Sequence, residues 1–152
     1  MEGQSELYFA YASNLNVERM ANRKAFFTRR VHAILQGYKL EFSFNSGSGY
    51  GSATIVPDPN SEVHGALYTL EKGGLEKLDI FESVPQGKYR RVAIEVGLDD
   101  GDIVECTAYI ATEAYCKPGL IPSKEYLGHL LKGKDILPQN YYNILENHEC
   151  GE

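Results

Sequence analysis

The chain has 152 residues, enough to bury a core without disulfides or metals, so we expect a single domain over residues 1–152. The net charge is −6 and no stretch is rich in Lys and Arg, which argues against sequence-independent binding of nucleic acid. Apolar runs are too short to cross a bilayer, and no basic-then-apolar leader precedes the first predicted strand. We therefore expect a cytoplasmic protein with neither a nucleic-acid nor a membrane partner.

The cysteines and histidines do not form a metal-binding pattern. There are three cysteines without CxxC spacing, and the four histidines are scattered along the chain. A structural zinc site needs four closely arranged ligands, and motifs for nucleotide or metal chemistry are missing. We expect no metal, no cofactor and a reducing compartment.

The first quarter of the chain predicts a strand followed by a short helix. Residues 7–11 are aromatic-rich and uncharged, which is typical of a strand. Asn14 or Asn16 can cap a helix over residues 16–24, with Glu18 in its first turn. A second strand follows, in which Gly37 permits a bulge before an alternating face made of Tyr38, Leu40, Phe42 and Phe44.

The middle of the chain predicts two further strands, a helix and a hairpin. Residues 53–56 form a short strand that P-D-P-N should end, and residues 62–70 form another, in which Gly65 suggests a close backbone approach. Residues 71–81 place apolar side chains at helical spacing. The turn D-D-G-D then joins two strands, residues 89–98 and 103–111.

Two short helices end the chain, one capped by Ser123 and one preceded by Pro138. In total we expect about six strands, mostly antiparallel, and three or four short helices. Strands and helices do not alternate regularly, which argues against a doubly wound parallel sheet. The predicted class is α+β, with a curved sheet or small barrel.

The stretch Y-F-A-Y-A-S-N-L, residues 8–15, joins a strand to small polar residues. Consecutive backbone N–H groups in such a turn can bind a carboxylate or stabilise an oxyanion. A strand that simply precedes an Asn-capped helix is the alternative, and the local pattern alone favours it. Ser13 as a nucleophile is a weaker hypothesis, because the glycines of a nucleophile elbow and a partnered His or Asp are missing.

Glu82 is the second candidate for chemistry. It follows the predicted helix beside Phe81 and Val84, and a carboxylate held against apolar groups tends to have a raised pKa suited to proton transfer. On composition alone, Asp79 and Glu76 on the same segment are equally good candidates for proton transfer. A solvated residue at a helix end is the simpler interpretation of Glu82.

The two candidates combine in one family pattern. Residues 8–15 closely resemble the Y-F-A-Y-G-S-N-L signature of the γ-glutamylcyclotransferase family, and L-D-I-F-E-S-V-P-Q-G-K-Y, residues 78–89, resembles its L-D-x-x-E-x-V-x-x-G-x-Y motif. Y-K-L-E-F, G-S-A-T-I, E-V-H-G-A-L-Y and P-S-K-E-Y match in the same order. The resemblance implies a small mixed, mostly antiparallel β-barrel flanked by short helices.

The resemblance also implies a reaction, in which the α-amine of a γ-glutamyl group attacks its own side-chain carbonyl and releases 5-oxoproline and an amine. Glu82 would be the general base and acid. The substrate would contact a set of residues from the signature and two later tyrosines: Tyr8, Phe9, Ala10, Tyr11, Ala12, Ser13, Asn14, Tyr89 and Tyr126. The partner would be a small γ-glutamyl molecule.

One position departs from the family pattern, because Ala12 stands where the family has glycine. A positive φ there would cost about 1 kcal/mol with alanine, whereas an ordinary φ would only add a methyl group near the pocket. The leaving amine stays open between an amino acid and another amine, as in deprotection of a γ-glutamylated metabolite; glutathione is less favoured. A non-catalytic binding module on the same barrel is the alternative function, and a homodimer is left open.

Overall fold

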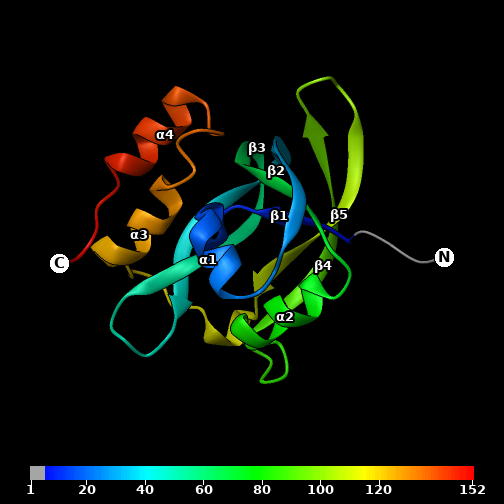
Figure 1. The fold of residues 1–152 in the computed structure, drawn as a ribbon. Coiled ribbons are helices and arrows are strands. Elements are labelled where there is room, and N and C mark those ends of the chain that lie inside the picture. Colours follow the sequence, from blue (N-terminus) through cyan, green and yellow to red (C-terminus); the bar gives the residue numbers. More distant parts are fainter. Residues whose placement is uncertain (1–5) are drawn as a thin grey trace.

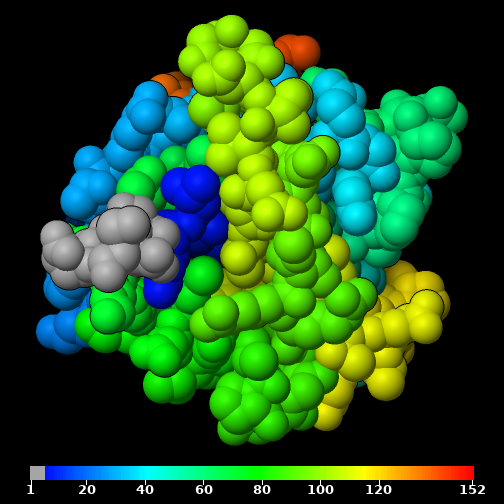
Figure 2. All heavy atoms as spheres, turned by 90° about the vertical axis from the view of Figure 1, so that its right-hand side faces the viewer, coloured from blue at the N-terminus to red at the C-terminus, as the bar shows by residue number. Residues whose placement is uncertain are grey.

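The computed structural model describes residues 6–152, in which five strands close into a barrel in the order β1-β3-β2-β4-β5 (Figure 1). All neighbouring strands are antiparallel except β1 and β5, which pair in parallel where Tyr8 meets Thr107. Figure 2 shows this closure, with blue β1 beside yellow-green β5. The strands are β1 Glu6–Ala10, β2 Phe27–Asn45, β3 Gly51–Leu70, β4 Tyr89–Leu98 and β5 Ile103–Ala111. The predicted α+β class and mixed, mostly antiparallel barrel are confirmed.

The barrel has five strands because β3 is continuous. Residues 53–56 and 62–70 belong to one strand of 20 residues, and P-D-P-N lies within it instead of ending it. The β2–β3 register shifts between Gln36 and Tyr38, and Gly37 has φ +82 there. Prolines lack an N–H and are tolerated at such an irregularity, so the strand continues through them.

The predicted close approach at Gly65 is confirmed. A Cβ at Gly65 would collide with the carbonyl oxygen of Ala10 and the ring of Phe9. Glycine on β3 therefore lets the end of β1 pack directly against it, and the turn that follows β1 is held at the end of the barrel.

Four helices lie against the barrel: α1 Val17–Asn22, α2 Gly74–Phe81, α3 Lys124–Leu131 and α4 Gln139–Glu146. In Figure 1, α3 and α4 cover one side and α2 lies below the barrel. Asn16, one of the two predicted caps, accepts a hydrogen bond from the Glu18 amide at 3.1 Å, and Ser123 caps α3 as predicted. The 3₁₀ turns are η1 Ser13–Leu15 and η2 Glu113–Tyr115.

The core is apolar, and its largest fully buried side chains include Tyr68 and Phe9 from the barrel and Leu15 and Met20 from η1 and α1. Within residues 6–152, no helix is both long and apolar enough to span a membrane. The same residues contain no group of three or more His, Cys, Asp or Glu side chains arranged to hold a metal ion.

Candidate active site

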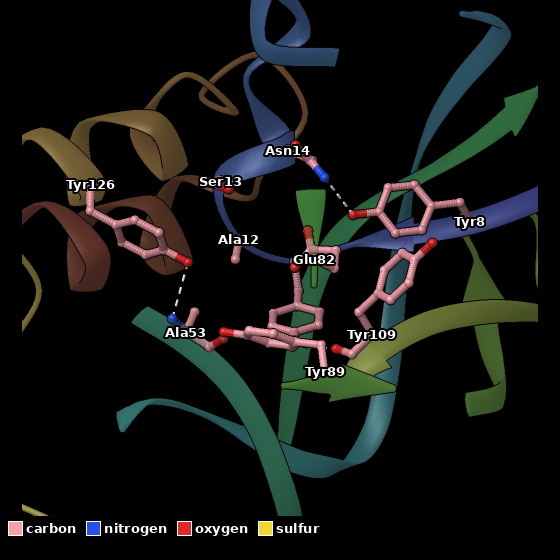
Figure 3. Close-up of a pocket in the computed structure, with 10 residues that line it drawn as sticks. Tyr8, Ala12, Ser13, Asn14, Ala53, Glu82, Tyr89, Tyr109 and Tyr126 are labelled. Carbon is pink, nitrogen blue, oxygen red and sulfur yellow. Dashed lines mark hydrogen bonds between the residues drawn. The ribbon is translucent and has the colours of Figure 1, made fainter. Parts of the chain in front are cut away.

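A tyrosine-rich cavity opens where β1 runs into η1 and where α2 ends (Figure 3). The signature turn, Ala12–Asn14, lines part of the cavity, and Glu82 at the end of α2 lines another part. The lining residues are Tyr8, Tyr11, Ala12, Ser13, Asn14, Ala53, Glu82, Tyr89, Tyr109 and Tyr126. Segments far apart in the sequence therefore meet in one site.

Most residues singled out in the sequence line this cavity, but Phe9 and Ala10 do not. They are 0% and 1% exposed and belong to the core, where they hold β1 against β3. Conversely, Ala53 and Tyr109 line the cavity without having been predicted. Ala53 lies in the G-S-A-T-I motif, which could have suggested it, whereas Tyr109 looks like any aromatic residue of a strand.

The turn at Ala12–Asn14 lines the cavity and carries backbone donors that have no partner among residues 6–152. Ala12 has φ −134, so alanine does not occupy a left-handed conformation here and its effect is a methyl group in the cavity wall. Among the hydrogen bonds of residues 6–152, none uses the backbone N–H of Ala12, Ser13 or Asn14. Adjacent unpaired N–H groups can bind a ligand oxygen.

Two tyrosine hydroxyls are placed to donate hydrogen bonds. Tyr8 Oη accepts from Asn14 Nδ2 at 2.9 Å, and Tyr126 Oη accepts from the Ala53 amide at 3.0 Å, so each hydroxyl hydrogen is left for another acceptor. Burial raises the pKa of Tyr8 and raises that of Tyr126 to about 12. Both therefore remain protonated at neutral pH and act as donors.

Tyr89 is oriented the opposite way. Its hydroxyl donates to the carbonyl oxygen of Ala53 at 2.7 Å, which leaves lone pairs on Oη to accept a hydrogen bond. Tyr89 and Tyr126 thus hold the two backbone groups of the same β3 residue (Figure 3). The cavity therefore contains both hydrogen-bond donors, from Tyr8 and Tyr126, and an acceptor, from Tyr89.

Glu82 follows directly on α2, and its amide donates to the Leu78 carbonyl at 2.8 Å. Its side chain is 17% exposed and lines the cavity. Burial raises the pKa of Glu82, and the positive charges of Arg23 and Arg19 oppose that rise only in part. A carboxyl group in this state exchanges protons more readily near neutral pH than an exposed one.

Arg23 links Glu82 to the signature turn, although sequence reasoning did not identify it. Its Nη1 lies 3.4 Å from Glu82 Oε2 and 3.3 Å from Asn14 Oδ1, and its guanidinium lies 4.9 Å from the centre of the Phe81 ring. Arg19, four residues earlier, donates from Nε to Ser13 Oγ at 3.1 Å. Two arginines one helical turn apart, directly after the signature, were a signal that could have found them.

Ser13 lacks the partners of a nucleophile. Its hydroxyl accepts from Arg19, and within residues 6–152 no His or Asp side chain forms a hydrogen bond with it. His129 lies nearby but contacts Arg19 and Asn16 instead. A positively charged neighbour in place of a general base leaves the hydroxyl unactivated.

The other two carboxylates of the segment are not in the cavity. Asp79 is held by Arg91 through two hydrogen bonds of 2.9 and 2.7 Å and by the Tyr109 hydroxyl at 2.7 Å. Glu76 is exposed. Of the three candidates, Glu82 alone lines the cavity.

Comparison with known proteins shows the family of this chain. A sequence profile of the AIG2-like family matches residues 62–145. The γ-glutamylcyclotransferase of Mus musculus is 34% identical over 158 residues, covering 99% of this chain and 82% of the relative. The chain belongs to the γ-glutamylcyclotransferase family of enzymes.

Two further comparisons give the same family assignment. The γ-glutamylcyclotransferase of Homo sapiens is 33% identical over 150 residues, covering 94% of this chain and 78% of the relative. A solved structure described as a γ-glutamyl cyclotransferase superposes with a TM-score of 0.85 at 32% identity, covering 98% of this chain and 90% of that one. The barrel and its flanking helices are therefore those of the family.

Proposed function

We propose that this family member cyclises γ-glutamyl amides and that Glu82 is its general base and acid. The α-amine of the substrate attacks the side-chain amide carbonyl, the carbon–nitrogen bond to the leaving amine breaks, and 5-oxoproline and a free amine are released. The observation that supports this best is the position of Glu82 in the same cavity as the Ala12–Asn14 turn.

The turn and the tyrosines would hold the substrate's oxygens. The N–H groups of Ala12, Ser13 and Asn14 have no acceptor within residues 6–152, and the Tyr8 and Tyr126 hydroxyls each have a hydrogen to donate. Negative charge develops on the carbonyl oxygen during attack, and fixed donors stabilise it without reorganising. The same kind of donor suits the α-carboxylate of the glutamyl group.

Glu82 would move the proton that cyclisation requires. The substrate's α-amine starts as an ammonium ion, so an ionised Glu82 must first take a proton from it before the nitrogen can attack. The protonated carboxyl group then gives that proton to the leaving nitrogen as the tetrahedral intermediate collapses. The attacking nitrogen loses a second proton to become the lactam N–H, and this proton ends on the released amine, which leaves as an ammonium ion. Because the nucleophile belongs to the substrate itself, proximity supplies much of the rate enhancement and no enzyme nucleophile is needed.

The test is to incubate the protein with γ-glutamyl amides of several amino acids and simple amines and to measure 5-oxoproline by mass spectrometry. We expect 5-oxoproline and the free amine in equal amounts. Release of glutamate would instead indicate hydrolysis. Binding of these amides without turnover would indicate a non-catalytic binding module on the same barrel.

A further inference from the structure

A second cavity adjoins the tyrosine-rich one and lies on the outer side of Glu82, Tyr89 and Tyr126, which line both. The two share Ser13, Glu82, Tyr89 and Tyr126 in their linings, so they border on each other at these residues. If the glutamyl group occupies the inner cavity, the amine on the far side of the scissile bond extends into this outer cavity. In that arrangement the side chains of the outer cavity would contact the leaving amine.

The charges around the outer cavity are predominantly positive. Arg19, Arg23 and Lys88 line it, and Glu82 is the one acidic residue in its wall. The guanidinium of Arg23 contacts Glu82 and Asn14, and that of Arg19 contacts Ser13 and His129. The Lys88 ammonium has no ion-pair or hydrogen-bond partner among residues 6–152, so it is the cation left for a ligand.

Lys88 directly precedes β4, and backbone hydrogen bonds fix its main chain in place. Its amide donates to the Ser83 carbonyl at 3.1 Å, and its carbonyl accepts from the Thr112 amide at 2.8 Å. The next residue, Tyr89, is buried and lines both cavities. Lys88 therefore starts from a fixed point at the cavity edge, while its flexible stem lets the ammonium reach a charge within the cavity.

We propose that Lys88 is a specificity-determining residue, whose ammonium pairs with an anionic group, such as a carboxylate, on the leaving amine. This inference rests on the proposed function, because it names the residue that selects among the amines released by that reaction. It favours leaving groups with a carboxylate near the scissile nitrogen over neutral amines of similar size.

The test compares two substrates that differ only in this charge, γ-glutamyl-alanine and γ-glutamyl-alaninamide. Alanine and alaninamide differ in their intrinsic reactivity as leaving groups. A preference of the wild-type protein for one substrate therefore does not by itself test the role of Lys88. The decisive quantity is the ratio of kcat/KM for the carboxylate substrate to kcat/KM for the carboxamide, and its change on substitution of Lys88.

Lys88→Gln should lower this ratio by about tenfold, the size expected when a charged hydrogen bond is lost, and chiefly through KM of the carboxylate substrate. Lys88→Arg should retain most of the ratio, because it keeps the charge. The matched control is Arg90→Gln, which removes the same charge two residues away at an exposed position outside both cavities and should leave the ratio unchanged.

The possible failures are distinguishable. If neither substrate yields 5-oxoproline with the wild type, the proposed function is wrong and this inference falls with it. If both are turned over but Lys88→Gln leaves their ratio unchanged, or Arg90→Gln lowers it as much, the inference alone is overturned. Thermal unfolding of each variant separates a loss of folding from a loss of selectivity. Lys88→Met, which also removes the charge, replaces Lys88→Gln should that variant fold poorly, and an unchanged ratio in Lys88→Met would overturn the inference.

Discussion

Asp79 and Glu82 lie three residues apart at the end of α2, yet their surroundings differ. Asp79 accepts two hydrogen bonds from Arg91 and one from Tyr109. Burial would raise the pKa of Asp79, but these hydrogen bonds outweigh it and the pKa is lowered. Glu82 has a single contact with Arg23 at 3.4 Å, and burial raises its pKa.

The difference teaches that burial and the number of hydrogen-bond donors together set the direction in which the pKa of a carboxyl group shifts. Asp79 has its charge neutralised and ties α2 to β4 and β5 through Arg91 and Tyr109. Glu82 is buried with fewer partners, so its charge is stabilised less and its proton is exchanged more readily. From sequence composition alone, the two carboxylates were equal candidates for proton transfer.

The largest effect should come from removing the Glu82 carboxylate. Glu82→Gln keeps the size of the side chain but cannot take a proton from the substrate, so we expect kcat to fall by about 100- to 10,000-fold. The measurement is the rate of 5-oxoproline formation, with Asp79→Asn as the matched control. Activity of Glu82→Gln within a few-fold of the wild type would disprove the proposed role.

Asp79→Asn should act on stability instead. The variant loses the ion pair with Arg91 and weakens the Tyr109 bond, so the free energy of unfolding should fall by about 1–3 kcal/mol while turnover stays close to that of the wild type. Urea unfolding followed by circular dichroism measures this. A large loss of kcat without a loss of stability would contradict the structural role.

The two carboxylates should also give opposite pH dependences of stability. The pKa of Asp79 is lowered on folding, so its contribution is present above the unfolded-state pKa and is lost as pH falls through the folded-state pKa. The pKa of Glu82 is raised, so its contribution is present at acid pH and is lost as pH rises through the folded-state pKa. The deficit of Asp79→Asn should therefore shrink at acid pH, and Glu82→Gln should gain stability relative to the wild type toward neutral pH.

Arg23 offers a smaller test of the same contrast. The proposed mechanism needs ionised Glu82, so kcat/KM should rise with pH on the acid side, through a pKa above that of an ordinary carboxyl group. Arg23→Gln removes a charge that opposes the effect of burial, so this acid limb should move to higher pH. An acid limb that stays in place would show that Arg23 does not set the protonation of Glu82.

The smallest effect should come from Ala12→Gly, which restores the family residue. Because Ala12 already has a negative φ, glycine relieves no left-handed conformation, and it should lower the free energy of unfolding by about 0.4–1 kcal/mol through the entropy of the unfolded chain. Removal of a methyl group from the cavity wall should change KM more than kcat. A clear gain in stability would contradict this account of the turn.

Local sequence determined most of the elements of this protein. The Asn16 and Ser123 caps, the D-D-G-D hairpin and the glycines at positions 37 and 65 each depend on the chemistry of a few adjacent residues, and the structure confirms them. The one long β3 was missed because P-D-P-N usually ends a strand. Its pairing with β2 along the barrel overrides that local preference.

The site was determined by both levels. The sequence pattern singled out the signature turn and Glu82, but only the closed barrel shows that they share a cavity with Tyr109 and that Arg23 joins them. The choice between Asp79 and Glu82 was likewise made by tertiary contacts. Burial and hydrogen-bond donors set the pKa of a carboxyl group, and those donors come from strands and helices distant in the chain.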